Sequence, residues 1–288
     1  MTAHAGDLIG LDIGGTSLKA VRVGADGRVI ATVTVPAGGL MAREDLLGLI
    51  GKTVADLARG DSIARIGAAI GGAVGPGGVM PADATNLPNL AGVPLPPLLR
   101  ERLGRPCSVI NDAQAAMHGE AWVGAARGAS DVLMVTFGTG IGAGLVLGGK
   151  SRSGPHGTAG ELGASPILGA AGVTTLEEIA APVRFERRVG RRLGARGFER
   201  GLDGETDAAL DAIGRALAGA HLLLDLDVIV LGGAIASSGE PFRAAIEAAF
   251  RRALAASFRS GVSIVLGTLG PYAGAIGAVA PAVPEPPA

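Results

Sequence analysis

The sequence predicts an α/β protein built from two related domains. Apolar runs with the pattern of strands alternate with amphipathic runs with the pattern of helices along most of the 288 residues, which is typical of the α/β class. The first element is an apolar strand, a glycine turn with a threonine and a second strand, and it recurs after Asp131. Such an internal repeat predicts two domains of similar design, and the chain is long enough to give each a core.

The first glycine element reads LDIGGTSLK over residues 11–19. Asp12 ends an apolar strand, and Gly14 and Gly15 turn the chain into the next strand. Because glycine has no Cβ, such a turn brings bare N–H groups close to an anion. Thr16 adds a hydroxyl, and Asp12 adds a carboxylate of the kind that binds Mg²⁺. The stretch predicts a phosphate cradle with Mg²⁺ nearby, and an ordinary glycine hairpin is the alternative.

The remaining elements follow from hydrophobic periodicity and turn residues. The further strands are expected at residues 17–23, 29–35, 65–70, 107–110, 132–135, 143–147, 228–231 and 262–266. The helices are expected at residues 43–59, 96–103, 113–122, 176–181, 183–193, 207–224, 242–258 and 272–279. A loop rich in Gly, Pro and Asn spans residues 75–94, and loops of that length are often functional.

Composition argues against several classes of protein. The net charge of −1 and the 3% of aromatic residues give no support to nucleic-acid binding. Cys107 is the only cysteine, so neither an internal disulfide nor a cysteine-based zinc cluster is expected. The N-terminus lacks the pattern of a signal peptide, and Asp225 and Asp227 interrupt the most apolar window. We therefore expect a cytoplasmic protein with no membrane or nucleic-acid partner.

The glycine elements differ from two common nucleotide-binding motifs. In a Rossmann unit the glycines open a helix, whereas the residues after Thr16 have the pattern of a strand. No Gly-Lys-Ser/Thr follows the glycines, so the Walker A motif is also absent. A pair of β-hairpins that grip phosphates from two domains is instead how the actin, Hsp70 and sugar-kinase superfamily works.

Five motifs occur in the order and approximate spacing of the ROK family, which contains bacterial sugar kinases and related repressors. They are DIGGTSLK (12–19), IND (110–112), FGTGIGAG (137–144), GTAGELG (157–163) and VLGGAIA (230–236). The chain resembles this family from residue 8 to about residue 279. The resemblance implies two actin-like ATPase (ribonuclease H-like) domains with an active-site cleft between them. The smaller would hold residues 1–112 plus about 271–288, and the larger residues 113–270.

The resemblance assigns the role of general base to Asp112. A sugar hydroxyl is a poor nucleophile, and a carboxylate at a strand end can accept its proton as it attacks the γ-phosphate. A carboxylate that only caps the helix starting at Ala113 is the alternative explanation. The polar residues that the resemblance assigns to the sugar are Asn86, Asn111, Glu161 and Glu177. From the residues alone, Asn86 could be a turn residue and Glu177 an acid of a first helical turn.

The resemblance also assigns residues to ATP and Mg²⁺. Asp12 would pair with Mg²⁺, and the predicted ligands of the nucleotide and its phosphates are Asp12, Gly14, Gly15, Thr16, Lys19, Gly138, Thr139, Gly140, Gly142, Gly232 and Gly233. Lys19 could equally be a solvated strand lysine. Gly232 and Gly233 could simply be turn residues that end a strand. A basic run follows at Arg184, Arg187, Arg188, Arg191 and Arg192. It has the pattern of a solvated face, or of a surface for a polyphosphate donor.

The chain departs from the family at the zinc site. Most ROK kinases carry a histidine after the Glu-x-Gly motif and a cysteine cluster beyond it, and these hold a structural zinc. Here Ala164 stands at the histidine position, and the cysteine region has no cysteine. We expect no zinc. Because the histidine also contacts the sugar, its replacement leaves room for a substituent or a water near Ala164.

Together these observations predict a sugar kinase that uses Mg·ATP to phosphorylate a hexose, with glucose as the best guess. Alternatives within the family are a polyphosphate-dependent kinase and a kinase of an N-acetylhexosamine or fructose. A non-catalytic regulator that senses sugar is the alternative from another class. The family resemblance further implies a homodimer.

Overall fold

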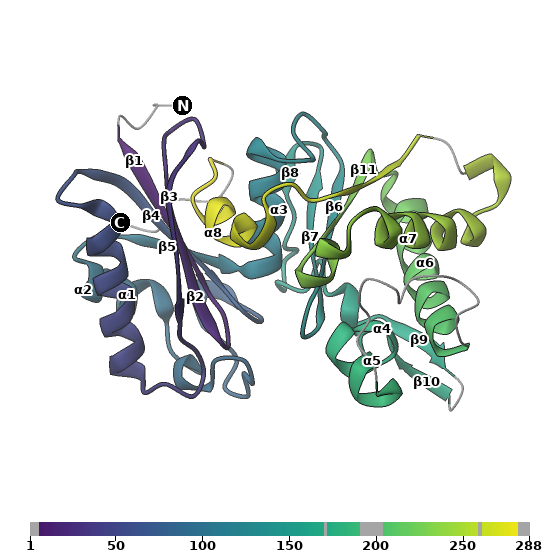
Figure 1. The fold of residues 1–288 in the computed structure, drawn as a ribbon, viewed down its shortest axis with the longest axis horizontal. Coiled ribbons are helices and arrows are strands. Elements are labelled where there is room, and N and C mark those ends of the chain that lie inside the picture. Colours follow the sequence, from purple (N-terminus) through teal and green to yellow (C-terminus); the bar gives the residue numbers. More distant parts are fainter. Residues whose placement is uncertain (1–5, 170–171, 191–203, 259–260, 282–288) are drawn as a thin grey trace. The chain divides into compact units, whose positions relative to one another are not determined.

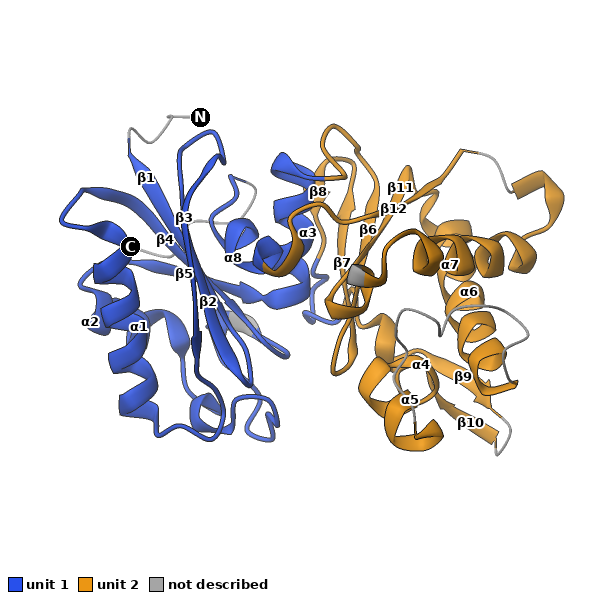
Figure 2. Ribbon diagram, viewed as in Figure 1, with its two compact units in different colours: residues 1–124, 153–158, 272–288 blue, residues 125–152, 159–271 orange. Residues whose placement is uncertain are grey.

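The computed structural model describes residues 6–169, 172–190, 204–258 and 261–281. Its contacts divide the chain into two compact units (Figures 1 and 2). Unit 1 holds residues 1–124, 153–158 and 272–288, and unit 2 holds residues 125–152 and 159–271. The hydrophobic core around Leu11 and Ile50 draws its residues from unit 1, and the core around Phe137 and Phe250 draws its residues from unit 2.

Unit 1 is a five-stranded mixed sheet with helices on both faces (Figure 1). Its strands are β1 (Asp7–Ile13), β2 (Ser17–Val23), β3 (Val29–Pro36), β4 (Ile63–Ile70) and β5 (Cys107–Asn111), in the order β3-β2-β1-β4-β5. Its helices are α1 (Arg43–Ala58), α2 (Leu95–Leu103), α3 (Asp112–Val123) and α8 (Ala273–Ala278). Helices α1 and α2 lie on one face of the sheet, and α3 and α8 on the other (Figure 1).

Glycines let α8 lie directly on this sheet. A Cβ added to Gly10 of β1 would stand 1.8 Å from the Ala275 carbonyl oxygen, and one added to Gly67 of β4 would stand 2.0 Å from that of Ala278. Real Cβ atoms never approach so closely, so the two strands need glycine at these positions. The small residues of α8 and the bare strand glycines therefore explain why the end of the chain packs in unit 1.

Unit 2 contains a second five-stranded mixed sheet and a separate hairpin. The large sheet has β6 (Val132–Phe137), β7 (Ile141–Leu147), β8 (Lys150–Ser151), β11 (Val228–Gly232) and β12 (Ser263–Leu266), in the order β12-β11-β6-β7-β8. The hairpin pairs β9 (Pro166–Gly169) with β10 (Gly172–Thr175). The helices are α4 (Leu176–Ala180), α5 (Pro182–Val189), α6 (Gly204–Leu224) and α7 (Glu240–Ala253).

The two large sheets share one topology. In unit 1 three antiparallel strands, β1 to β3, are extended by β4 and β5, which run parallel to β1. In unit 2 three antiparallel strands, β6 to β8, are extended by β11 and β12, which run parallel to β6. The strand orders correspond element by element, so the predicted α/β class and the internal repeat are confirmed.

Several boundaries differ from the expectations from sequence. Helix α3 (Asp112–Val123) falls in unit 1 and not after a boundary at residue 112, because its residues pack closely against α8. Helix α7 stops at Ala253, and the expected continuation to residue 258 is a separate short 3₁₀ turn. The β9–β10 hairpin was not expected, because its sequence has no clear alternation. Residues 191–193 of the expected 183–193 helix lie outside the described residues. No helix in the described part of the chain is long and apolar enough to cross a membrane.

Candidate active site

The carboxyl ends of three parallel strands meet at one edge of the unit 1 sheet. The strand register aligns Ile13 of β1 with Ile70 of β4, and Ile70 with Asn111 of β5. Asp12 and Asp112 therefore lie at the same edge, on either side of the chain that leaves β4. Ligands of open α/β sheets bind at such carboxyl ends. The structure thus brings together two acids that are a hundred residues apart in the sequence.

Asp12 pairs with Lys19 across the β1–β2 ladder. The two residues stand directly opposite in the register, and the Lys19 Nζ lies 3.4 Å from the Asp12 Oδ2. Burial raises the pKa of the Asp12 carboxyl, and Lys19 acts in the opposite direction. A Cβ added to Gly274 of α8 would stand 3.2 Å from the same Asp12 oxygen. A largely buried carboxylate with one cationic neighbour is a donor of the type that Mg²⁺ uses together with phosphate oxygens.

Asn111 caps α3 and orients Asp112. Its Oδ1 accepts hydrogen bonds from the backbone N–H groups of Ala113 and Gln114, both at 3.0 Å. Its Nδ2 donates to the Gly72 carbonyl at 2.9 Å and to the Asp112 Oδ1 at 3.1 Å. Both amide hydrogens and both lone pairs of Asn111 are therefore engaged inside the protein. The predicted contact of Asn111 with a sugar stays a prediction, and the structure adds a role in holding Asp112.

The Asp112 carboxyl is poised to exchange a proton near neutral pH. Burial raises its pKa to about 7, and the negative charge of Asp12 adds to the rise. Backbone hydrogen bonds from Ala113, Asp112 and Gly72 act in the opposite direction. The Ala113 N–H lies 2.9 Å from the Oδ1. A carboxyl with a pKa near the working pH suits a general base, and this property goes beyond the cap that was the alternative explanation.

The first glycine turn is open to solvent and braced from behind. The Gly14 N–H donates to the Ser17 carbonyl at 3.0 Å, while Gly15 and Thr16 are exposed. A Cβ on Gly38 would stand 1.9 Å from the Gly15 carbonyl oxygen, so the chain after β3 packs directly behind the turn. The turn is therefore packed against the chain on one side and leaves Gly15 and Thr16 exposed, and binding of phosphate by these residues stays a prediction.

Asn86 lies beside this turn. Its backbone carbonyl oxygen would stand 3.1 Å from a Cβ on Gly15, and its Nδ2 3.8 Å from a Cβ on Gly72. The side chain is exposed. Since Gly72 also accepts the hydrogen bond from Asn111, the loop at residues 75–94 brings Asn86 to the edge that carries Asp112.

Unit 2 repeats the arrangement with the β6–β7 turn. The Gly138 N–H donates to the Gly140 carbonyl at 2.9 Å, and a Cβ on Gly138 would meet no atom within 4 Å. Thr139 is exposed, and Gly142 pairs with Thr136 in the ladder. The turn therefore presents bare backbone to open space.

Gly232 and Gly233 lie behind the same turn. Gly232 pairs with Thr136 of β6 in the parallel register. Gly233 has φ +85°, and a Cβ there would stand 2.3 Å from the Phe137 carbonyl oxygen. Both a left-handed backbone and a close approach thus require glycine at residue 233. The structure brings the two predicted nucleotide segments of unit 2 together at one sheet edge.

Glu177 and Glu161 have different surroundings. The Glu177 Oε2 accepts the Ile141 N–H at 2.9 Å, directly after the β6–β7 turn, and its Oε1 lies 3.0 Å from an Arg184 nitrogen. Glu161 is exposed at the start of a 3₁₀ turn that ends at Ala164. The Glu161 side chain is exposed, whereas Glu177 is already tied to the turn.

The basic run of α5 is largely neutralised by acids. Arg184 pairs with Glu177 and Glu178, and Arg188 with Glu205. This pairing weakens the case for a polyphosphate surface on α5. Arg191 and Arg192 lie outside the described residues.

The sequence does not predict the roles of four further residues at these sites. They are Gly71 and Gly72 after β4, Gly274 of α8 beside Asp12, and Arg184 beside Glu177. A Cβ on Gly71 would stand 3.5 Å from the Gly14 Cα and 3.7 Å from the Asp112 Oδ2. The Gly-Gly pair at a strand end was a usable signal, because the same pattern marks residues 14–15 and 232–233.

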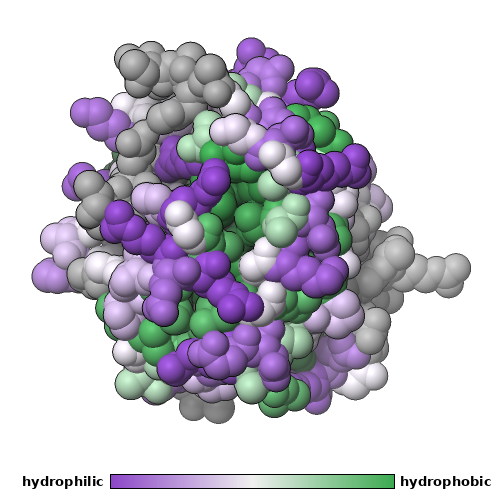
Figure 3. Space-filling view, turned by 90° about the vertical axis from the view of Figure 1, so that its left-hand side faces the viewer, coloured by the Kyte–Doolittle hydropathy of each residue, from purple (hydrophilic) through white to green (hydrophobic). Residues whose placement is uncertain are grey.

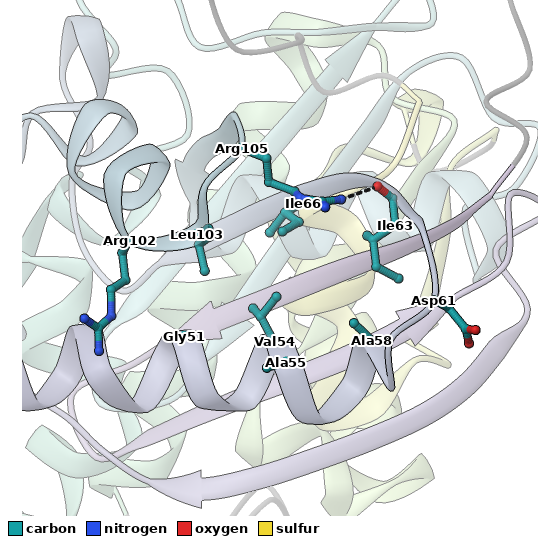
Figure 4. Close-up of a pocket in the computed structure, with 10 residues that line it drawn as sticks. All are labelled: Gly51, Val54, Ala55, Ala58, Asp61, Ile63, Ile66, Arg102, Leu103 and Arg105. Atoms are coloured by element: carbon teal, nitrogen blue, oxygen red, sulfur yellow. Dashed lines mark hydrogen bonds between the residues drawn. The ribbon is translucent and has the colours of Figure 1, made fainter.

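A pocket of about 220 Å³ opens elsewhere on unit 1, among α1, α2 and β4 (Figure 4). Its lining is mixed, with apolar Val54 and Leu103 beside charged Asp61 and Arg102 (Figure 4). Arg105 donates a hydrogen bond to the Ile63 carbonyl (Figure 4). The space-filling view of this side of the molecule shows hydrophobic residues between hydrophilic ones (Figure 3). The pocket shares no residue with the predicted site.

Among the described residues, no group of three His, Cys, Asp or Glu side chains is arranged to hold a metal ion. A single carboxylate such as Asp12, completed by substrate oxygens, is a different kind of metal site.

Comparisons with known proteins identify the family. The ROK family model matches residues 8–184. A glucokinase of Thermotoga maritima is 27% identical over 264 residues, which cover 81% of this chain and 83% of that protein. An N-acetylmannosamine kinase of Escherichia coli is 31% identical over 179 residues, which cover 60% of each chain.

A solved structure supports the same family assignment. A ROK family glucokinase from Streptomyces griseus in complex with glucose and AMPPNP superposes with a TM-score of 0.79 at 27% identity, covering 95% of this chain and 98% of that one. The predicted actin-like ATPase fold is therefore confirmed. Because the family match spans more than half of its residues, the chain belongs to the ROK family.

Proposed function

We propose that the protein is a sugar kinase that transfers the γ-phosphate of ATP to a hydroxyl of a hexose, with glucose as the first candidate. The observation that carries the proposal is the Asp112 carboxyl. It stands at the end of β5, is oriented by Asn111, and has its pKa raised to about 7. Relatives that are glucokinases support the choice of sugar.

Asp112 acts as the general base. Its carboxylate takes the proton of the attacking hydroxyl while the oxygen forms its bond to the γ-phosphorus, and the bond from that phosphorus to the β,γ-bridging oxygen breaks. ADP leaves with that oxygen, and Asp112 releases the proton to solvent after the sugar phosphate departs. A positioned base of this kind contributes roughly 10²- to 10⁴-fold to the rate. Asn86 and Glu161, which are exposed, are the proposed direct contacts of the sugar. Asn111 and Glu177 are proposed to contact it while sharing the hydrogen bonds that they already make within the protein.

Two glycine turns hold the donor. The turns at residues 14–16 and 138–140 are proposed to bind the phosphates through the N–H groups of Gly15, Thr16, Thr139 and Gly140, because those of Gly14 and Gly138 are bonded within the turns. Lys19 offers a positive charge. Gly142, Gly232 and Gly233 shape the nucleotide side of the second turn. Asp12 is the proposed protein ligand of Mg²⁺, which neutralises the charge that develops on the phosphate oxygens. Its buried carboxylate beside an open turn fits that role.

A kinase of N-acetylmannosamine is the second candidate. The relative from Escherichia coli with that name supports it. So does Ala164, because an alanine in place of the family's histidine is smaller and leaves room for an acetamido group.

The test is a substrate panel with purified protein. Glucose, mannose, fructose, N-acetylglucosamine and N-acetylmannosamine are each incubated with Mg·ATP or with polyphosphate, and ADP and sugar phosphate are measured. Phosphorylation of glucose from ATP that is lost in Asp112→Asn supports the proposal. Preference for N-acetylmannosamine as the acceptor supports the second candidate. Preference for polyphosphate over ATP shows that polyphosphate, and not ATP, is the phosphate donor. Sugar binding by calorimetry with no product from any donor overturns the kinase assignment in favour of a sugar-sensing regulator.

A further inference from the structure

We infer that Arg184 and Arg188 of α5 form an arginine clamp that positions the Glu177 carboxylate and, through it, the glycine turn at residues 138–140. Both arginines are positioning residues in this inference, since neither is placed against a substrate. The functional part rests on the proposed function, in which that turn binds the phosphates of ATP. All the residues involved belong to unit 2.

The first link joins Glu177 to the turn. Its Oε2 accepts the Ile141 N–H at 2.9 Å. A Cβ on Gly140 would stand 2.4 Å from that oxygen, and one on Gly163 would stand 3.2 Å from it. The carboxylate reaches the backbone only because these neighbours are glycines. A carboxylate on a backbone N–H is a charge-assisted hydrogen bond, so it restrains the chain where the turn ends.

The second link joins Arg184 to Glu177. One terminal nitrogen of its guanidinium lies 3.0 Å from the Glu177 Oε1, and the other pairs with the Glu178 carboxylate. A guanidinium is a planar fork, so contact with two acids at once sets its orientation. Since Arg184 holds one Glu177 oxygen, it directs the other toward the Ile141 N–H.

The third link joins Arg188 to the backbone of α4. Its two terminal nitrogens donate to the carbonyl oxygens of Glu178 and Ile179, each at 2.7 Å, and its Nε donates to Glu205 at 3.0 Å. Helix α4 has five residues, which is too short to be stable by itself. The last carbonyls of a helix need partners, and a cation favours the negative end of its dipole. Arg188 therefore fixes the short helix that carries Glu177.

These ion pairs act on position more than on stability. The side chains of Arg184 and Arg188 are 42% and 36% exposed, and exposed ion pairs contribute little to the free energy of unfolding. A small displacement of a phosphate-binding turn, in contrast, is costly for transfer. Variants of the clamp should therefore lose donor binding while they remain folded.

The first experiment follows the turn itself, without substrate. Amide hydrogen exchange of a peptide covering residues 137–142 is compared among the parent, Arg184→Met, Arg188→Met and Arg187→Met. Arg187 is the matched control, because it is exposed on the same helix and has no hydrogen bond or ion pair to the residues that the structure describes. We expect several-fold faster exchange in Arg184→Met and Arg188→Met only. Equal exchange in all four proteins overturns the inference.

The second experiment measures the KM for ATP. In Arg184→Met and Arg188→Met it should rise roughly three- to tenfold, the range expected of residues that act through another residue, with the melting temperature nearly unchanged. Arg184→Lys should restore part of the loss, and Arg187→Met should behave like the parent. Glu177→Gln keeps an acceptor for the Ile141 N–H but removes the charge that Arg184 pairs with, so Arg184→Met added to Glu177→Gln should have little further effect. If the effects of Arg184→Met and Glu177→Gln on the KM for ATP are fully additive, Arg184 does not act through Glu177 and the inference is overturned.

The two readouts separate the inference from the proposed function. In one outcome, exchange of residues 137–142 is faster in Arg184→Met and Arg188→Met while no protein, the parent included, turns over ATP. That result supports the clamp and contradicts the proposed kinase function. Normal ATP turnover in every variant, with unchanged exchange of residues 137–142, contradicts the clamp and supports the proposed kinase function.

Discussion

The side-chain amide of Asn111 donates a 3.1 Å hydrogen bond to the carboxylate of its neighbour Asp112. The same amide caps α3 and reaches the Gly72 carbonyl, so one residue ties together the end of β5, the start of α3 and the chain after β4. Burial and the charge of Asp12 raise the Asp112 pKa, while a hydrogen-bond donor such as the Asn111 amide favours the charged form of the carboxyl.

Replacing Asn111 with Asp should shift the pH dependence of activity. Asn111→Asp keeps an oxygen for the helix cap but removes the donor to Asp112 and adds a negative charge beside it. Both changes disfavour ionised Asp112, so its pKa rises. Log kcat/KM of the parent should climb with slope one up to about pH 7 and then level, and in the variant this limb should move to higher pH. A limb that stays in place or moves to lower pH contradicts the assignment.

Asp112→Asn should lose activity and gain stability. We expect kcat to fall roughly 10²- to 10⁴-fold, since the base is lost. The folded-state pKa of about 7 lies above that of an unfolded aspartate, so ionised Asp112 destabilises the fold as the pH rises from about 4 to 7. Removing the charge should raise the free energy of unfolding at pH 8 by on the order of 2–4 kcal/mol, and the gain should vanish near pH 4. Urea titrations at the two pH values measure it. An equal effect at both pH values rules out a raised pKa.

Gly277→Ala should separate α8 from α3. A Cβ at residue 277 would stand 1.6 Å from the Ala115 carbonyl oxygen, which is backbone and cannot move aside. Overpacking of this kind costs about 1–3 kcal/mol or more.

Gly219→Ala is the matched control for that change. Gly219 lies in α6, where a Cβ would meet no atom within 4 Å, so this substitution should stabilise by about 0.5–1 kcal/mol through helix propensity. Thermal melts of both variants measure the two changes in stability. Equal stability of the two would show that the close approach of α8 to α3 is not required.

His118 should make the protein sensitive to mild acid. The side chain is 1% exposed, and neither ring nitrogen has a hydrogen-bond partner among the described residues. Burial, with help from the positive charge of Arg65, lowers its pKa to about 4. An unfolded histidine takes up its proton near pH 6.5, so the fold loses on the order of 2 kcal/mol between pH 8 and pH 5 from this group.

The variant His118→Leu should lack this loss. Its melting temperature relative to the parent should therefore rise as the pH falls from 8 to 5. His156→Gln is the control, because His156 is exposed. If both variants follow the parent at every pH, the buried histidine is not the cause of acid sensitivity.

Local pattern in the sequence determined the α/β class, the repeat and most strands and helices of this protein. Asp12, Asp112 and Gly232 could be placed at strand ends because apolar runs and glycines lie next to each other in the chain. A parallel arrangement then predicts that such ends meet at one edge. Family resemblance added the roles of these residues, which periodicity alone does not contain.

Only the tertiary structure decided which of these groups are engaged and by what. Glu177 meets the Ile141 N–H across 36 positions of sequence, and α8 meets α3 across more than a hundred and fifty residues. Such contacts depend on strand register and on the absence of a Cβ at residues such as Gly140 and Gly277, which no window of neighbouring residues reveals. The raised pKa of Asp112 has the same origin, because burial and a second carboxylate at the same sheet edge exist only once the three strands have paired.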